Sequence, residues 1–314
     1  MTSLIASAPG KVVLCGEYAV LDGAPAISMA LERRAVVTLT PGSGGGSGLQ
    51  SIGLAGATDR SLFDCAVAAV GARKTDECCF VLDTSEFSDA GSARKFGIGS
   101  SAALMVALCR ALAGDETSDS DVGDIAASAH RAFQGGTGSG VDIATSVAGG
   151  LIEFRMAGNA VTRLTWPSGL TFAVLWSGVP VDTKERVDKL STRVEKQSRK
   201  ALSVAATTAA AAWKSADADA VMTAHGEYGD ALIRFSVDHD LGIFEAGHEA
   251  LSRAAIDDAV VYKPCGAGGG DIGIALATSA SRLDEFVERA CAMGFRHLDC
   301  AIDLTGVKLE REGE

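Results

Sequence analysis

Two glycines and two serines in the segment Gly97–Ser101 could together bind a phosphate group. Gly97 and Gly99 carry no side chain, so a ligand can approach the backbone closely there. Ser100 and Ser101 stand where the cap of a helix belongs, because an Ala- and Leu-rich run follows them. The unpaired N–H groups and the positive dipole end of such a helix attract anions. The spacing is not that of a P-loop, and the alternative is an ordinary tight turn before a core helix.

Two other glycine-rich segments could also carry chemistry. Four glycines lie within the six residues Gly135–Gly140, and Asp142 then begins an apolar run to Val147. An Asp at the start of a helix is usually only a cap. The third segment, Gly266–Asp271, lies between two strand-like runs. Its backbone N–H groups could form an anion-binding nest, and a glycine-rich β-turn is the alternative.

The composition narrows the class of protein. The chain has 314 residues, of which 47% are hydrophobic and 22% charged, as in an ordinary globular protein. This length predicts two domains. The net charge of −12 argues against nucleic acid as a partner and against a basic membrane-binding surface. An anionic substrate stays compatible with this charge, because a few lysines can dominate a cleft.

Nothing in the sequence predicts secretion or insertion into a membrane. The N-terminus lacks a basic segment followed by an apolar one, and no apolar run reaches the roughly 20 residues that span a bilayer. The eight cysteines show no C-x-x-C spacing, and several lie in apolar runs. We therefore expect a cytoplasmic protein whose thiols are reduced and structural rather than paired in disulfides or bound to a metal.

The hydrophobic pattern predicts an α+β protein. Residues 3–40 should form β segments around glycine-rich turns, and the Gly-Ser run 42–48 should form a solvent loop. An apolar helix is expected over Ala102–Leu112, with Gly114 as its C-terminal cap. The other expected elements are helices over 61–73, 119–133, 183–215, 217–235, 241–254 and 281–293, and strands over 151–155, 171–176, 259–264, 272–277 and 295–303.

Three motifs together carry a resemblance to a known family. Residues 8–21 read Ala-Pro-Gly-Lys-Val-Val-Leu-Cys-Gly-Glu-Tyr-Ala-Val-Leu, residues 95–109 contain the Gly-Ser segment, and residues 263–273 read Lys-Pro-Cys-Gly-Ala-Gly-Gly-Gly-Asp-Ile-Gly. In this order they resemble the three motifs of the GHMP kinases, which use ATP to phosphorylate small metabolites. The resemblance implies an N-terminal domain like domain 2 of ribosomal protein S5, over 1–160, and a ferredoxin-like C-terminal domain, over 161–314. The active site would lie between them.

The resemblance also implies roles for individual residues. Lys11 and Asp142 match the catalytic pair of the mevalonate branch of the family. The lysine would draw negative charge toward the transferred phosphoryl group, and the carboxylate would orient or deprotonate the acceptor. The cofactors would be ATP and Mg²⁺, with Ser101 as a metal ligand. The residues expected to bind ATP are Gly97, Gly99, Ser100, Ser101 and Ala102.

One departure from the family concerns the metal. Many relatives supply a Glu to Mg²⁺ shortly before the catalytic Asp, and this region here reads Ala129-His130-Arg131, with no carboxylate. We therefore expect the metal to be held mainly by phosphates, water and Ser101. His130 is expected to be an ordinary, satisfied helix histidine rather than a ligand.

Several details resemble the phosphomevalonate kinases more than other members of the family. These details are Lys95-Phe96 directly before Gly97, Gly16-Glu17-Tyr18, Gly138-Ser139-Gly140 and Gly268-Gly269-Gly270-Asp271. By contrast, Gly23-Ala24-Pro25-Ala26-Ile27 resembles the mevalonate kinases. Mevalonate therefore stays the alternative acceptor, followed by a sugar or another small metabolite.

A phosphorylated acceptor brings about two negative charges near neutral pH and needs cations around it. Lysines and an arginine stand beside the motifs, namely Lys95, Lys184, Arg186 and Lys263, and surface solubility is the alternative explanation for each. The residues expected to bind the acceptor are Lys11, Tyr18, Lys95, Ser139, Gly140, Asp142, Lys184, Gly266, Ala267 and Gly268.

A second class of function stays open, that of a catalytically silent binding protein on the same scaffold. The presence of Lys11, Ser101 and Asp142 together favours catalysis. The expected partners are ATP and a small phosphorylated acceptor, with neither nucleic acid nor a membrane, and the protein is expected to be a monomer or a homodimer.

Overall fold

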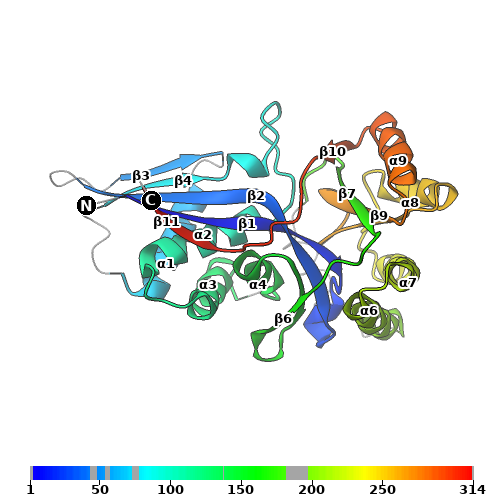
Figure 1. Ribbon diagram of the computed structural model, residues 1–314, viewed down its shortest axis with the longest axis horizontal. Helices are drawn as coiled ribbons and strands as arrows, with labels where there is room; N and C mark the ends of the chain where they lie inside the picture. Colours follow the sequence, from blue (N-terminus) through cyan, green and yellow to red (C-terminus); the bar gives the residue numbers. More distant parts are fainter. Residues whose placement is uncertain are drawn as a thin grey trace.

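The computed structural model describes residues 3–42, 48–53, 57–72, 78–136, 138–181 and 197–312. Two β-sheets, each covered by helices on one face, make up this part of the chain (Figure 1). Within the described ranges no helix combines the length and the apolar character needed to cross a bilayer.

The first sheet is built on two long antiparallel strands, β1 and β2, whose hydrogen-bonded ladder has two register shifts. In order across the sheet, the strands are β11 (Lys308–Arg311), β1 (Leu4–Cys15), β2 (Ala26–Pro41), β4 (Cys78–Asp83) and β3 (Gly48–Ile52). Strand β2 is long enough to pair with two different strands along the same edge. Its start pairs with β5 (Leu151–Arg155) and its end with β4, and β5 in turn pairs with β6 (Ala160–Leu164).

Four helices pack on one face of this sheet (Figure 1). They are α1 (Ala57–Val70), α2 (Ser100–Ala113), α3 (Asp119–Phe133) and α4 (Val141–Ala148). Ten consecutive residues of α2, Ala102–Ala111, are buried. Apart from Arg110, which pairs with Asp119, these residues are apolar, as expected of a helix that is buried on all sides. The helix that begins at the Gly-Ser segment is therefore the central helix of this layer.

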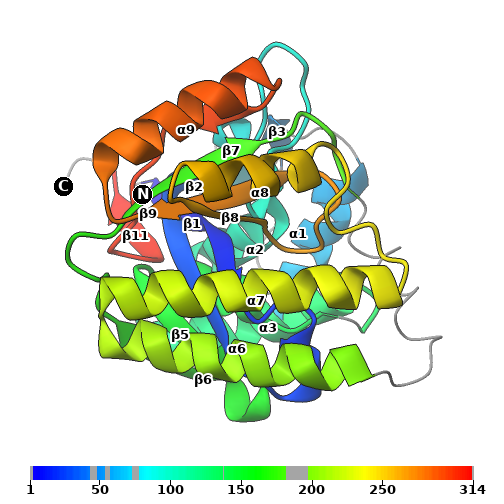
Figure 2. The same ribbon diagram turned by 90° about the vertical axis from the view of Figure 1, so that its right-hand side faces the viewer.

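The second sheet is fully antiparallel, in the order β10-β7-β9-β8. Its strands are β7 (Thr171–Trp176), β8 (Val261–Pro264), β9 (Ile272–Ala277) and β10 (Arg296–Leu298). Its helices are α6 (Gln197–Ser215), α7 (Ala218–Asp238), α8 (His248–Asp257) and α9 (Ala280–Ala292), which form an outer layer in Figure 2. In chain order the strands lie as fourth, first, third and second, with helices in the first and third connections. This is the ferredoxin-like arrangement that the resemblance implied.

The predicted α+β class is confirmed, and the sheets show where the chain passes between its two parts. The first sheet includes β6, which ends at Leu164, and β11, which comes from the C-terminal end of the chain. A division at residue 160 separates both strands from their sheet. Neither strand has an apolar pattern that predicts it, because β6 is almost wholly exposed and β11 is short and mainly charged.

Other expectations differ in detail. The helix expected over 241–254 begins only at His248, because the chain turns at Gly242 and Gly247, both with positive φ. The strand expected over 295–303 is shorter, and strands β3 and β4 were not foreseen. Residues 183–196 of the long predicted helix, and 43–47 of the Gly-Ser loop, lie outside the described residues.

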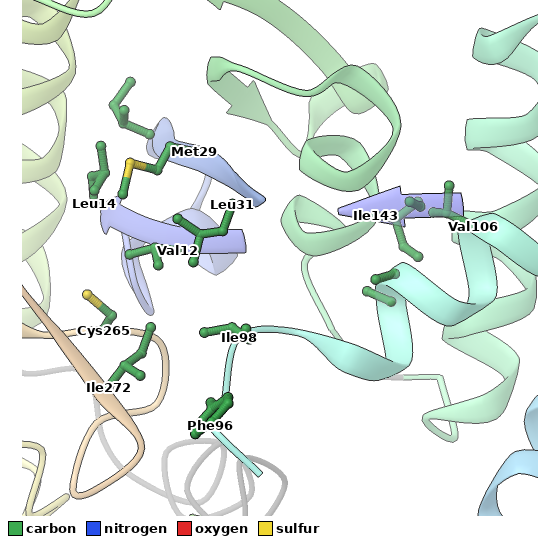
Figure 3. Packing of buried hydrophobic residues seen from close by; sticks show 14 of the residues in the cluster. Val12, Leu14, Met29, Leu31, Phe96, Ile98, Val106, Ile143, Cys265 and Ile272 are labelled. Carbon is green, nitrogen blue, oxygen red and sulfur yellow. The ribbon is translucent and has the colours of Figure 1, made fainter. Parts of the chain in front are cut away.

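One hydrophobic core joins the two sheets. Figure 3 shows side chains of β1 and β2, such as Val12 and Leu31, in one cluster with Ile98 before α2 and with Ile272 from the second sheet. Phe96 packs edge-on against Trp176, with ring centroids 5.2 Å apart. The segment that precedes the phosphate-binding candidate is therefore fixed by packing from both parts of the molecule.

Candidate active site

A cavity of about 180 Å³ lies where the three motifs meet. The turn after β1, the segment before α2, the glycine loop before α4 and the β8–β9 loop all contribute to its wall. The lining residues used below are Lys11, Glu17, Tyr18, Gly97, His130, Gln134, Ser139, Gly140, Asp142, Cys265, Gly266, Ala267 and Asp271. Segments that are far apart in the sequence are thus brought to one place.

Lys11 and Asp142 form an ion pair in the wall of this cavity. Lys11 Nζ lies 3.3 Å from Asp142 Oδ1, and the exposed fractions of the two side chains are 9% and 35%. The backbone N–H of Lys11 donates to the carbonyl oxygen of Ile98 at 2.9 Å, which ties β1 to the segment before α2. The structure therefore brings the predicted pair together, while its catalytic role stays a prediction.

Two helices begin beside Lys11. The N-terminal cap of α2 is Gly99, with φ of 84°, and that of α4 is Gly140, with φ of 88°, and neither helix has a side-chain cap. A Cβ atom on Gly99 would lie 3.1 Å from Cε of Lys11, so the lysine runs across the start of α2. Asp142 stands in the first turn of α4. The N-terminal ends of two helices and one ammonium group thus lie close together, an arrangement suited to phosphate.

The sequence assigned the cap of α2 to the wrong residues. Ser100 and Ser101 were expected there, but Gly99 takes this position because the backbone turns into the left-handed region, which glycine tolerates best. Both serines therefore belong to the first helical turn. Ala102, the third residue of α2, is fully buried, so any ligand contact it makes is through its backbone.

The hydroxyl of Ser101 lies beside an imidazole. Ser101 Oγ is 3.2 Å from Nε2 of His130, which is buried and lines the cavity. Burial lowers the pKa of His130, and the charge of Asp142 acts in the opposite direction. His130 has the partner that a satisfied helix histidine needs, but it also belongs to the site, which the sequence analysis did not foresee.

The donor atoms at the site suit a magnesium ion that arrives with a nucleotide. Across the described ranges, no three His, Cys, Asp or Glu side chains gather so as to hold a metal ion. Mg²⁺ prefers oxygen ligands and is usually bound through one or two carboxylates together with substrate phosphates. The hydroxyl of Ser101 and the carboxylate of Asp142 are oxygen donors of this kind, so the residues fit a phosphate-borne ion rather than a protein cage.

Tyr18 reaches from the first motif to the third. Its hydroxyl donates to the carbonyl oxygen of Ala267 at 2.7 Å, and its ring packs on Phe235 with centroids 5.4 Å apart. Tyr18 has φ of 62°, a conformation that costs free energy for a residue with a Cβ atom. Of the residues expected to bind the acceptor, Tyr18, Gly266 and Ala267 line the cavity, whereas Gly268 faces Ile243 behind the loop. Their binding role stays a prediction.

Lys263, one of the cations beside the motifs, is neither exposed nor among the residues that line the cavity. Its side chain is fully buried and forms an ion pair with Glu17, and it donates to the carbonyl oxygen of Pro264 at 3.1 Å. Tyr228 donates to Oε2 of Glu17 at 2.8 Å. Burial disfavours the charge on Lys263, but the carboxylate of Glu17, which also accepts a hydrogen bond from it, favours that charge, and on balance the pKa of Lys263 is raised. Lys263 therefore joins the two parts of the molecule beneath the cavity.

Only some of the remaining predicted residues line the cavity. Ser139 and Gly140 line the cavity, and Ser139 Oγ accepts from the backbone N–H of Val141 at 3.3 Å. Lys95 is exposed, and it is not among the residues that line the cavity. Its charge acts instead on Asp59. Lys184, like Arg186, lies outside the described residues, so its role stays a prediction.

Besides His130, the sequence analysis missed further residues that line the cavity. Gln134 and Asp271 also line the cavity, and Cys265 lies in its wall as one of the free cysteines. Burial raises the pKa of the Cys265 thiol to about 11, although Lys263 opposes this. A thiol that stays protonated is a poor nucleophile, which agrees with the structural role expected of the cysteines. Gln134 and Asp271 stand at the ends of glycine-rich segments, and that position is the signal that could have found them.

Comparisons with known proteins agree with this geometry. The family description "GHMP kinases N terminal domain" matches residues 87–150, which include the Gly-Ser segment and Asp142. The chain is 30% identical to the phosphomevalonate kinase of Streptomyces sp. (strain CL190), over 90% of the chain and 92% of that protein. It is 31% identical to the mevalonate kinase of Aeropyrum pernix, over 58% of the chain and 60% of that protein.

The fold is shared with a solved structure. The phosphomevalonate kinase of Streptococcus pneumoniae, in complex with phosphomevalonate and AMPPNP, superimposes with a TM-score of 0.81. The match covers 98% of this chain and 99% of the other at 18% identity, which shows a common fold. The predicted family resemblance and the two-part architecture are both confirmed.

Proposed function

The chain belongs to the GHMP kinase family, and on that premise we propose that it transfers the γ-phosphoryl group of ATP to phosphomevalonate, giving diphosphomevalonate and ADP. As a kinase it is a phosphotransferase. The proposed reaction belongs to the mevalonate pathway of isoprenoid synthesis. The observation that carries the proposal is the Lys11–Asp142 ion pair in a cavity that all three motifs line. Similarity to the Streptomyces enzyme over most of both chains supports the choice of acceptor.

Positioning and positive charge do most of the work in phosphoryl transfer. The ammonium of Lys11 stands between the starts of α2 and α4, where it can attract the charge that spreads over the transferred group. Phosphomevalonate is a phosphate monoester with a second pKa near 6, so it is mostly a dianion at pH 7. Such a nucleophile needs no proton removed. Asp142 then orients the acceptor and balances the charge of Lys11.

The ATP phosphates are assigned to the segment Gly97–Ala102 at the start of α2. The backbone N–H groups of the first helical turn would donate to phosphate oxygens, since no side chain caps this helix. When bound, Mg²⁺ would neutralise charge on those oxygens, and Ser101 is the residue placed to hold it. The hydroxyl of Ser101 is oriented by its contact with His130.

Mevalonate is the second candidate acceptor, because the chain is 31% identical to a mevalonate kinase over 58% of its length. The two acceptors make different chemical demands. An alcohol has a pKa far above 7 and gains from a general base, by typically 10²–10⁴-fold. With mevalonate, Asp142 would have to act as that base.

The test is a coupled assay of ADP release with phosphomevalonate, mevalonate, galactose and homoserine. We expect kcat/KM for phosphomevalonate to exceed that of each other compound by at least about 10²-fold, a difference of about 2.7 kcal/mol. Lys11→Met should abolish most of this activity, whereas Lys200→Met, at an exposed position of α6, should retain it. A preference for mevalonate would show that mevalonate, and not phosphomevalonate, is the acceptor. Activity with none of the four compounds would contradict a small-metabolite acceptor of this kind.

A further inference from the structure

The loop Gly266–Gly270 is held through two of its carbonyl oxygens by side chains from two other segments of the chain. Tyr18, from the first motif, donates its hydroxyl to the carbonyl of Ala267 at 2.7 Å. His248, the first residue of α8, lies with Nε2 at 3.0 Å from the carbonyl of Gly270. The two contacts come from different parts of the molecule, and Tyr18 is 249 positions from its partner in the sequence.

The direction of the His248 contact follows from its surroundings. The ring is fully buried, and burial lowers the pKa of His248 to about 4, so it is neutral at pH 7. A neutral imidazole has one N–H group, and a carbonyl can only accept. The hydrogen therefore lies on Nε2, and Nδ1 accepts from the hydroxyl of Tyr262, which is 2.7 Å away. Tyr262 thus fixes the tautomer that binds the loop.

The backbone N–H groups of the loop differ from these carbonyl groups in their hydrogen bonding. The N–H of Gly269 donates to the carbonyl of Ile243 at 2.6 Å. Among the described residues, the N–H groups of Gly266, Ala267, Gly268 and Gly270 have no hydrogen-bond partner in the protein. Gly266 and Ala267 line the cavity. The loop therefore offers donors, while the acceptors at Ala267 and Gly270 are already occupied.

A glycine-rich loop can lose this arrangement easily. Glycine populates positive and negative φ about equally, so a peptide next to glycine can rotate at low cost. Rotation of the Gly266–Ala267 peptide would turn the carbonyl oxygen of Gly266 toward the place from which the N–H of Ala267 had pointed, and that oxygen would repel an anion. The bonds from Tyr18 and His248 fix the Ala267–Gly268 and Gly270–Asp271 peptides. With Ala267 and Gly270 held in this way, the neighbouring peptides that carry the unpaired N–H groups have less freedom to rotate.

We propose that Tyr18 and His248 are positioning residues that lock the peptides of this loop, so that its amides bind the phosphate of the acceptor. This assignment rests on the proposed function, because it takes a phosphorylated acceptor as the ligand. It changes the role of Tyr18 from a direct contact with the substrate to a contact with the loop that binds it. The backbone of Tyr18, with its positive φ, places the hydroxyl within reach of Ala267.

The test begins with Tyr18→Phe, which keeps the ring that packs on Phe235 and removes only the hydroxyl. We expect the KM for phosphomevalonate to rise about tenfold, as for the loss of one hydrogen bond, with the KM for ATP within twofold of the wild type. The matched control is Tyr228→Phe. It removes another buried tyrosine hydroxyl, which bonds to Glu17 and not to the loop. The control should lower the Tm about as much as Tyr18→Phe does, without a selective rise in the KM for phosphomevalonate.

The second variant, Tyr262→Phe, keeps His248 but removes the bond that fixes its tautomer. It should raise the KM for phosphomevalonate about threefold and leave that for ATP unchanged. If both variants changed the two KM values equally, or matched the control, the loop would be merely structural and the proposal would fail. A wild-type enzyme that does not use phosphomevalonate would instead overturn the proposed function first, so the two failures are distinguishable.

Discussion

Asp271 packs directly on Gly97, so that the third motif touches the second across the two parts of the molecule. A Cβ atom on Gly97 would lie 2.6 Å from Oδ2 of Asp271, and closer still to its Cβ and Cγ atoms. The backbone of Asp271 is fixed on both sides, since its N–H donates to Val179 at 2.7 Å and its carbonyl accepts from Ser177 at 2.8 Å. The start of the phosphate-binding segment thus has its position set by a loop of the other sheet.

Gly97→Ala is therefore expected to weaken ATP binding. The new methyl group must displace Asp271, and φ of 82° adds strain of about 1 kcal/mol. Gly114→Ala is the matched control, because Gly114 has φ of 73° at the other end of α2 with open space around it. Titration of both variants with ATP, together with urea unfolding, separates the clash from the strain. Equal losses of affinity in the two variants would show that the contact has no effect on the site.

Lys11→Met should lower kcat by about 10²–10³-fold, the typical effect of removing one electrostatic stabiliser of a transition state. Lys11 is buried at the start of two helices, so little water is available to replace its charge. Steady-state kinetics with saturating ATP and phosphomevalonate measure this change. A fall of less than about threefold would remove Lys11 from the proposed mechanism.

Asp142→Asn is expected to lower kcat and yet to leave a plateau of activity above about pH 7. The acceptor phosphate titrates near pH 6 and is then already the reactive dianion, so no base is required. A pH profile of kcat for the wild type and for this variant is the measurement. Complete loss of activity at every pH, with mevalonate as the better substrate, would favour the alternative acceptor.

Ser101→Ala should weaken the binding of Mg-ATP by about 1–3 kcal/mol, since a charge-assisted contact is lost. Ser100→Ala is the control in the same helical turn, and both variants keep their backbone N–H groups. Nucleotide affinity is measured by calorimetry with magnesium and again with a chelator. The difference between the variants should appear only with magnesium, and its persistence in the chelator would assign Ser101 to the phosphates instead.

Stability should fall as the pH drops from about 6.5 toward 4. Burial lowers the pKa of His248 to about 4 and also lowers those of His130 and His225, so the unfolded chain binds more protons in this interval. Each such group contributes a slope of at most about 1.4 kcal/mol per pH unit. Urea unfolding at several pH values measures the slope. His248→Gln should flatten it, whereas the exposed His297→Gln should not.

The sequence predicts those features of the fold and of the site that residues nearby along the chain determine. The bounds of α3 and β7 follow from local apolar patterns, and both agree with the prediction. The role of Lys263 could not be read in this way. The sequence shows a cation beside a motif, but its partner Glu17 is 246 positions away, and only the fold brings them together. For a buried group of this kind, the distant partner decides the function.

The cap of α2 illustrates a second limit. Serine is the better cap by preference, and two serines were available, yet Gly99 takes that position. The choice is made by the backbone, which must turn sharply so that Lys11 can pass the start of the helix. Close approach of two segments is a three-dimensional requirement, and local preference gives way to it.

The pairing of β11 with β1 makes the second sheet an insertion within the first. The chain leaves the first sheet after β6 and returns at β11, where Leu4 pairs with Arg311, so the first and the last described strands lie side by side (Figure 1). A truncated chain that ended at Leu164 would leave the edge of β1 without its neighbour, and such an edge invites aggregation. The same closeness suits the protein to circular permutation, in which a short linker joins the old ends and new ends open in an exposed loop.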